Sequence, residues 1–219
     1  MKIDQLAAQL KNGLLKNEPM SLHTSWLVGG PADYFVSPAD HDELIKIIKF
    51  CREAELPIFI LGNGSNLLVL DGEIRGLVLE IGEAFAYVKP TGSALIAGAG
   101  TSMTHLARTA AKAGLGGLEF AAGIPGTLGG ALIMNAGAFG GYIGEKVREV
   151  TVINRDAEMQ TLKGSELVFG YRHSNLVEAG VIVEALFELA PTDSAEALQR
   201  VNYYLAERRR RHPQLPSCG

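Results

Sequence analysis

Cysteine is scarce in this chain: Cys51 and Cys218 are the only two among 219 residues. Two cysteines so far apart exclude a scaffold of several disulfides, and we expect two reduced thiols in a cytoplasmic protein rather than one disulfide. The first 20 residues also lack the long apolar run of a signal peptide. No grouping of His, Cys, Asp or Glu has the spacing of a metal site, so we expect no metal.

Positive charge is also in short supply. The chain carries 20 Lys and Arg against 24 Asp and Glu, a formal net charge of −4. A protein without a broad basic field is a poor partner for nucleic acid. The one long apolar segment, residues 118–139, is interrupted by Pro125 and several glycines, so we expect no membrane span.

Glycine, in contrast, is concentrated in one place. Eleven of the 26 glycines fall between Gly114 and Gly144, where Glu119 is the only charged side chain. Glycine is costly in regular elements and useful where backbone must turn sharply or approach another group closely. The run therefore predicts a ligand lying against bare backbone, with N–H groups rather than Lys or Arg contacting any phosphate.

Hydrophobic periodicity predicts an α+β protein with two subdomains, over residues 1–90 and 91–192, followed by a segment at 193–219 that is mostly helix. We expect the apolar face of the second helix to place Cys51 in the core. Expected helices cover 1–20, 41–55, 101–112, where Thr101 is the predicted cap, and 194–211; expected strands cover 34–36, 57–61, 67–70, 76–81, 94–97, 147–153, 159–162 and 181–189.

The loop Gly62-Asn63-Gly64-Ser65-Asn66 follows a predicted buried strand. Successive N–H groups in such a turn form an anion-binding concavity, which suits a diphosphate. It is not the dinucleotide fingerprint, because Leu67 stands where the third glycine is required. An ordinary strand-to-strand turn is the alternative.

A second candidate is Gly123-Ile124-Pro125-Gly126-Thr127. Proline fixes φ, glycine permits unusual φ, and Thr127 is a predicted cap for the helix that follows. A helix N-terminus preceded by glycines is a ready phosphate site. The alternative is close packing of a thin helix, which Gly129-Gly130 would also permit.

Reactive side chains cluster in Phe169-Gly170-Tyr171-Arg172-His173-Ser174. Arg172 could stabilise an oxyanion or a carboxylate, and Tyr171 could orient it; a surface arginine in a polar turn is the alternative. We assign no role to His173 and expect His23 to be exposed. For Arg208–Arg211 we favour a solvated helix end over a ligand contact.

Taken in order, the motifs L-G-N-G-S-N, G-L-E-F-A-A-G-I-P-G-T-L-G-G-A with M-N-A-G-A, and F-G-Y-R-x-S resemble the UDP-N-acetylenolpyruvoylglucosamine reductases, the cell-wall flavoenzymes also called UDP-N-acetylmuramate dehydrogenases. The resemblance implies the two-subdomain FAD-binding fold of the vanillyl-alcohol-oxidase type. It implies a cytoplasmic enzyme of peptidoglycan synthesis, and so of cell shape and division, that reduces an enolpyruvyl UDP-sugar with NADPH.

The resemblance also assigns residues. It implies catalysis by Arg172 and substrate binding by Tyr171 and Arg172. The implied FAD-binding residues are Gly62, Asn63, Gly64, Ser65, Asn66, Ala122, Gly123, Ile124, Pro125, Gly126, Gly129, Gly130, Asn135, Gly137 and Ile182.

The family pattern continues as P-S-A-G-S-V-F, whereas the sequence here reads Pro216-Ser217-Cys218-Gly219. The resemblance therefore predicts that the proton-donor serine and the third, substrate domain lie beyond these residues, with Ser217 and Cys218 out of register for the donor. We expect impaired reduction and self-association through the surface that domain would cover. A non-catalytic flavin-binding module and another oxidase on the same fold are the alternatives.

Overall fold

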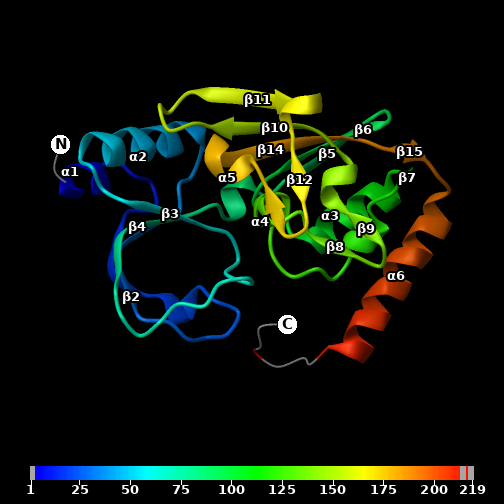
Figure 1. Ribbon diagram of the computed structural model, residues 1–219, viewed down its shortest axis with the longest axis horizontal. Coiled ribbons are helices and arrows are strands. Elements are labelled where there is room, and N and C mark those ends of the chain that lie inside the picture. Colours follow the sequence, from blue (N-terminus) through cyan, green and yellow to red (C-terminus); the bar gives the residue numbers. More distant parts are fainter. Residues whose placement is uncertain (1–2, 213–215, 217–219) are drawn as a thin grey trace.

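The computed structural model describes residues 3–212 and 216. Its chain forms two sheets that lie side by side, each with its own helices, and the short helix α4 lies near the middle (Figure 1). Because Ser217 and Cys218 lie outside the described residues, the expectations for them are not addressed by the structure.

The first sheet has four strands in the order β1-β2-β4-β3. They are β1 (Leu15–Pro19), β2 (Pro31–Val36), β3 (Ile58–Leu61) and β4 (Ile74–Glu80). Strands β2 and β3 both run parallel to β4, and β1 is antiparallel to β2. Helix α2 (His41–Glu53) begins where the Asp40 side chain accepts the Glu43 N–H, and it buries Leu44, Ile47, Ile48 and Cys51.

Two expectations for this half are wrong. Residues 1–20 do not form one helix: α1 covers Ile3–Ala7, Gly13 adopts φ +70°, and β1 then pairs with β2. The apolar run 67–70 is not a strand. Instead, Val69 packs against Gly29, and the Leu70 carbonyl accepts the Gly30 N–H. Only Val69 of this run is buried, whereas Leu68 and Leu70 are 54% and 73% exposed.

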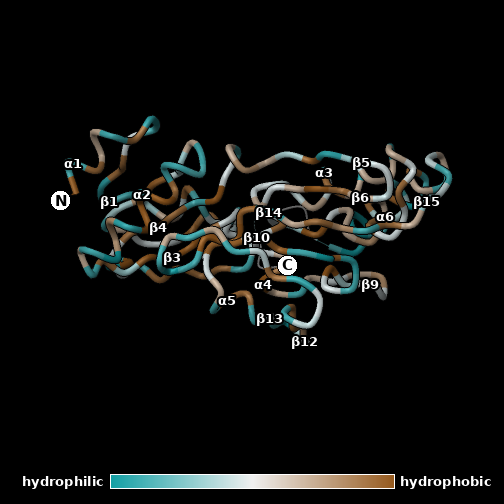
Figure 2. The backbone as a smooth tube through the Cα atoms, turned by 90° about the horizontal axis from the view of Figure 1, so that it is seen from above, coloured by the Kyte–Doolittle hydropathy of each residue, from teal (hydrophilic) through white to brown (hydrophobic). Residues whose placement is uncertain are grey.

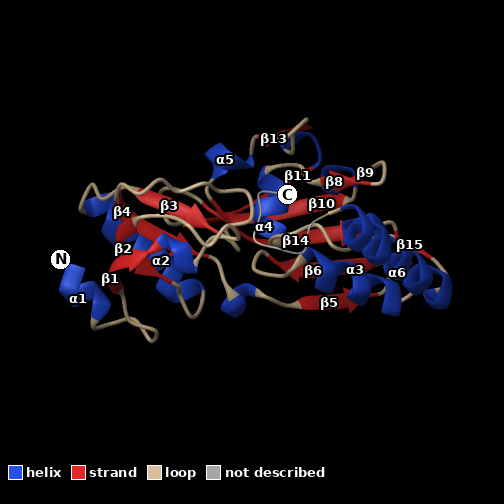
Figure 3. Cartoon of the chain, turned by 90° about the horizontal axis from the view of Figure 1, so that it is seen from below, coloured by secondary structure: helices blue, strands red, loops and turns tan. Residues whose placement is uncertain are grey.

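The second sheet is entirely antiparallel, in the order β11-β10-β14-β6-β5. Its strands are β5 (Val88–Thr91), β6 (Ala94–Gly98), β10 (Val147–Ile153), β11 (Met159–Lys163) and β14 (Val181–Glu188). Helices α3 (Met103–Lys112) and α6 (Ser194–Arg211) pack against each other beside this sheet (Figure 3). Ser102, not Thr101, caps α3, because the Thr101 hydroxyl donates to the Tyr87 carbonyl.

Short elements connect these parts. They are the helices α4 (Leu128–Ile133) and α5 (Leu176–Ala179), the 3-10 turns Met20–Leu22, Glu83–Phe85, Glu119–Ala121, Ile143–Glu145 and Gly164–Glu166, and the two-residue strands β7 (Leu115–Gly116), β8 (Gly137–Ala138), β9 (Gly141–Tyr142), β12 (Phe169–Gly170), β13 (His173–Ser174) and β15 (Ala190–Pro191).

Apolar residues occur in both lobes (Figure 2), and one large buried cluster runs through both. It includes Cys51, as expected, and burial raises the pKa of that thiol to about 11. A smaller cluster around Phe35 and Val78 lies on the other face of the first sheet. None of the helices in the described part of the chain combines the length and apolarity needed to cross a bilayer.

Candidate functional site

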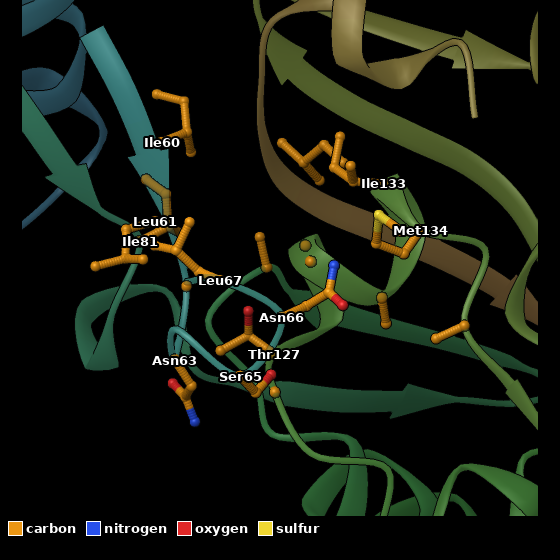
Figure 4. A pocket seen from close by; sticks show the side chains of 18 of the residues that line it. Ile60, Leu61, Asn63, Ser65, Asn66, Leu67, Ile81, Thr127, Ile133 and Met134 are labelled. Atoms are coloured by element: carbon orange, nitrogen blue, oxygen red, sulfur yellow. The ribbon is translucent and has the colours of Figure 1, made fainter. Parts of the chain in front are cut away.

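A cavity of about 750 Å³ opens between the two lobes, at the carboxyl end of β3. In Figure 4, Ile60, Leu61 and Ile81 lie on one side, and Ile133 and Met134 lie opposite them. Asn63, Ser65, Asn66 and Thr127 lie together at another part of its wall. The cavity is therefore apolar on its two flanks and rich in neutral polar groups where the loops meet.

Most residues expected at the cofactor site line this one cavity. They are Gly62, Asn63, Gly64, Ser65, Asn66, Ile124, Pro125, Gly126, Gly129, Gly130, Asn135, Gly137 and Ile182, and the expected substrate residues Tyr171 and Arg172 line it too. Two others do not. Ala122 is buried, and a methyl group on Gly123 would lie 2.7 Å from Cδ of Arg208 on α6.

The sequence reasoning missed the aliphatic walls of the cavity. Phe59 and Ile60 were expected in a buried strand, yet they are 40% and 43% exposed, and both line the cavity. A short apolar strand can be buried by protein or by a ligand, and the two give the same sequence pattern. Ile133 and Met134, at the end of α4, were missed because an apolar side chain in a predicted helix likewise gives no sign of whether protein or ligand covers it.

The two glycine-containing loops interlock where they meet. A methyl group on Gly62 would lie 2.5 Å from the Thr127 hydroxyl oxygen, and one on Gly126 would lie 2.7 Å from Ser65 Oγ. Gly126 has φ +109°, a conformation that side-chain-bearing residues rarely adopt. The Thr127 hydroxyl therefore packs against the backbone of Gly62, and the Ser65 hydroxyl packs against the backbone of Gly126. Because neither glycine has a Cβ, loop 62–66 and turn 123–127 can approach each other this closely.

Loop 62–66 offers several unused donors. The backbone N–H groups of Asn63, Gly64, Ser65 and Asn66 donate no hydrogen bond to any residue that the structure describes. Backbone donors that face a cavity without a protein acceptor need another partner, either water or a ligand. Successive N–H groups in a glycine turn suit an anion, so this loop is the stronger phosphate candidate of the two.

At the N-terminus of α4, two of the N–H groups that the sequence suggested for a phosphate are bonded within the protein. The Leu128 N–H donates to the Thr101 carbonyl, and the Gly129 N–H donates to the Ala99 carbonyl, both at 2.8 Å. The helix has only six residues, and Thr127 makes no side-chain capping bond. Its first two N–H groups are thus occupied by the loop that precedes α3, and α4 contributes a thin wall instead.

Loop 62–66 is held from behind by residues 23–25. Gly64 has φ +58°, and a methyl group there would lie 2.0 Å from the His23 carbonyl oxygen. His23 was expected to be exposed, but its side chain is only 18% exposed. Its Nε2 lies 2.9 Å from Glu18 Oε1, and its ring stacks on Phe35 at 3.9 Å. The pairing of β1 with β2 brings these groups together.

Asn135 connects the glycine run to the hairpin formed by β12 and β13. It has φ +45°, its Nδ2 donates to the Gly170 carbonyl, and its Oδ1 accepts the Gly144 N–H, both at 3.0 Å. The hairpin is also tied to α4, since Ser174 Oγ donates to the Ile133 carbonyl at 3.1 Å. These bonds fix the turn that carries Tyr171 and Arg172 at the cavity.

Among the described residues that line the cavity, Arg172 is the only charged one. Its Nη2 donates to Asn66 Oδ1 at 3.0 Å. Tyr171, beside it, is 86% exposed. Glu119, the one carboxylate of the glycine run, is not in the wall: it accepts the Gly117 N–H at 2.8 Å and lies 3.2 Å from Arg200 Nη2 on α6.

Comparison with known proteins identifies the class. Residues 31–163 match the family described as an FAD binding domain. The class is therefore that of flavin oxidoreductases with an FAD-binding α+β fold.

The sequence relatives identify the family. The chain is 45% identical over 224 residues to the UDP-N-acetylenolpyruvoylglucosamine reductase of Moorella thermoacetica, covering 100% of this chain and 74% of that protein. It is 42% identical over 217 residues to the enzyme of the same name from Desulforamulus reducens, covering 98% of this chain and 72% of that one. The chain belongs to the UDP-N-acetylenolpyruvoylglucosamine reductase family.

Solved structures agree with this fold. The UDP-N-acetylenolpyruvylglucosamine reductase from Thermus caldophilus superposes with a TM-score of 0.79 at 33% identity, covering 94% of this chain and 72% of that one. A Phl p 4 variant described as a glucose dehydrogenase gives a TM-score of 0.65 at 13% identity, covering 87% of this chain and 44% of the other, and shows the fold alone.

The residues present fit FAD. A flavin nucleotide joins a flat, largely apolar ring to a diphosphate, so it needs apolar walls next to unused donors. The cavity has both: aliphatic flanks at Ile60 and Ile133, and an unbonded N–H turn at residues 63–66. The missing Cβ at Gly126 leaves backbone exposed where a side chain would collide with Ser65.

Proposed function

We propose that this protein uses FAD and NADPH to reduce UDP-N-acetylglucosamine enolpyruvate to UDP-N-acetylmuramate, a precursor of peptidoglycan. One observation carries the proposal: of the described residues that form the cavity wall, Arg172 alone is charged, and the others are apolar or neutral. An enolpyruvyl carboxylate needs one fixed cation, and a flavin diphosphate can be held by neutral N–H groups.

The cofactor would be held by loop 62–66 and by turn 124–126, with Ile60 and Ile133 flanking its ring. When bound, FAD supplies a hydride carrier between NADPH and the enolpyruvyl double bond. The chain's own part is to hold the diphosphate on bare backbone and to keep water from the ring with aliphatic side chains.

Arg172 would bind the substrate carboxylate and stabilise the negative charge that builds next to it when hydride adds to the double bond. A guanidinium already fixed by a hydrogen bond meets that charge with little reorganisation. The contact with Asn66 and the bonds of Asn135 provide this fixation. Tyr171, which is exposed beside Arg172, would contact the substrate as well.

Other parts of the proposal concern the whole protein. We place the FAD-binding subdomains at 1–90 and 91–192, with 193–219 following them, and the enzyme in the cytoplasm, where it would support cell shape and division. For these 219 residues we propose flavin binding.

The test uses visible absorbance of the purified chain reconstituted with FAD under anaerobic conditions. NADPH should bleach the flavin, and the enolpyruvyl UDP-sugar should then reoxidise it. In Arg172→Ala, bleaching should persist and the rate of reoxidation should fall. A chain that binds no flavin contradicts the proposal. Bound flavin that NADPH cannot bleach would instead favour a non-catalytic module, and bleaching by an alcohol would favour an oxidase.

A further inference from the structure

The arginines at the end of α6 are not equivalent. Arg210 and Arg211 both pair with Glu207, with Nη2–Oε2 distances of 3.0 and 2.7 Å, and Arg209 is exposed. Arg208 is half-buried, and its guanidinium meets no carboxylate or other acceptor within residues 3–212. A solvated helix end explains its three neighbours but not Arg208.

The Arg208 side chain lies on the turn that leads into the cavity wall. A methyl group on Gly123 would lie 2.7 Å from its Cδ, 3.3 Å from its Nε and 3.3 Å from Leu205 Cδ2. Gly123 has φ +78°, and its N–H donates to Thr104 Oγ1 at 3.0 Å. The residues that follow it, Ile124 to Gly126, line the cavity. Glycine at this position lets a guanidinium approach the backbone of the turn.

Burial without an acceptor is unfavourable for a guanidinium. It lowers the pKa of Arg208, because the surroundings withdraw water from the charged form and supply no anion in its place. Packing of the aliphatic stem would explain the contacts of Cδ, but a stem can pack while the charged head remains in water. What stem packing leaves unexplained is a half-buried guanidinium that has no acceptor within residues 3–212.

We propose that Arg208 binds a diphosphate at the edge of the turn 123–126. This inference rests on the proposed function, which supplies two ligands with that group: the flavin nucleotide and the UDP-sugar. The neighbouring turn offers backbone and neutral side chains only, and Arg172 is the one charged side chain that the described residues contribute to the cavity wall. The Arg208 guanidinium, beside this wall, would give a bound diphosphate a full positive charge. It could bind the phosphate oxygens through two parallel N–H donors.

Three variants test the proposal. Arg208→Met keeps the stem and removes the charge, Arg208→Lys keeps the charge, and Arg209→Met removes an exposed charge one residue away as the matched control. Affinity for FAD is measured by quenching of flavin fluorescence, and affinity for UDP by calorimetry. Arg208→Met should weaken one of the two ligands about tenfold or more, as expected for a charge-assisted hydrogen bond. Arg208→Lys should recover part of the loss, and Arg209→Met should match wild type.

The two arms identify the source of the diphosphate: a loss confined to FAD assigns Arg208 to the cofactor, and one confined to UDP assigns it to the substrate. Unchanged affinities for both ligands, or equal losses in Arg208→Met and Arg209→Met, overturn the inference. A wild-type chain that binds neither ligand contradicts the proposed function instead. If Arg208→Met does not fold, the Nε–H resonance of Arg208, assigned with Arg208→Lys, must shift when FAD or UDP is added, and no shift with either overturns the inference.

Discussion

Asn66 Oδ1 accepts a hydrogen bond from Arg172 Nη2 at 3.0 Å, although the two residues are 106 positions apart. Asn66 belongs to the loop after β3 in the first lobe, and Arg172 belongs to the hairpin of the second. The same loop carries the unbonded N–H groups proposed to hold the diphosphate. One loop thus connects the cofactor cradle to the proposed catalytic guanidinium.

Replacing Asn66 with Ala should weaken binding of the enolpyruvyl UDP-sugar about three- to tenfold, the effect of losing one exposed hydrogen bond. The measurement is the substrate-induced change in the spectrum of the bound flavin. In the double variant with Arg172→Ala, the Asn66 substitution should add nothing further. Fully additive losses would show that Asn66 acts independently of Arg172.

Gly126→Ala tests the contact between the two loops. The new methyl group would lie 2.7 Å from Ser65 Oγ at a φ of +109°, so the turn must move. We expect FAD affinity to fall about tenfold or more, because backbone strain of this kind costs about 1–3 kcal/mol and the loops separate. Fluorescence titration measures it. Gly92→Ala, at φ +61° with no atom within 4 Å of the new methyl group, is the control and should retain flavin affinity; equal losses in both would contradict the interlocked-loop account.

The sequence predicted the regular elements better than the segments between them. Helix α2 was expected at 41–55 and covers His41–Glu53, because its apolar face and the Asp40 cap are both local signals. The apolar run at 67–70 resembles a strand in sequence, but only Val69 is buried, and it packs against Gly29, 40 residues earlier. The apolar composition therefore did not show whether the run pairs with another strand.

For the candidate site, too, the sequence predicted some features and not others. Glycine positions marked loop 62–66 and the turn at 123–127, since the need for bare backbone is visible in residue type. The sequence does not show which N–H groups stay unused, because that depends on distant carbonyls. Those of Ala99 and Thr101 accept the first two N–H groups of α4. Likewise, the partner of His23 is Glu18, which β1 brings beside it through pairing that the predicted helix excluded.

Asn135 provides a test of the hairpin's attachment. Asn135→Ala should lower the free energy of unfolding by about 1–3 kcal/mol, because the Gly144 N–H and the Gly170 carbonyl lose their partner. Asn135→Gly loses the same bonds but tolerates φ +45°, so the difference between the two variants isolates backbone strain. Urea unfolding of the flavin-free chain measures both. If Asn135→Gly matches wild type, the carboxamide does not hold the hairpin.

Cys51 gives a prediction about pH. Burial raises the pKa of its thiol to about 11 in the folded chain, above the ordinary value of 9.0 that it regains on unfolding. The unfolded chain then loses this proton at lower pH than the folded chain. The stabilisation is therefore complete below about pH 9 and is lost as pH rises through about 11.

The test measures the free energy of unfolding between pH 8 and 11 for wild type and Cys51→Ala, both carrying Cys218→Ser so that one thiol is followed. The wild-type background should lose on the order of 2 kcal/mol more than Cys51→Ala across this range, since each pKa unit corresponds to about 1.4 kcal/mol. In the same Cys218→Ser chain, a thiol reagent at pH 8 should react only after denaturant is added, because Cys51 is 1% exposed. Parallel pH profiles for the two chains would show that burial of the thiol does not contribute to the pH dependence. Rapid reaction without denaturant would show that the thiol is accessible.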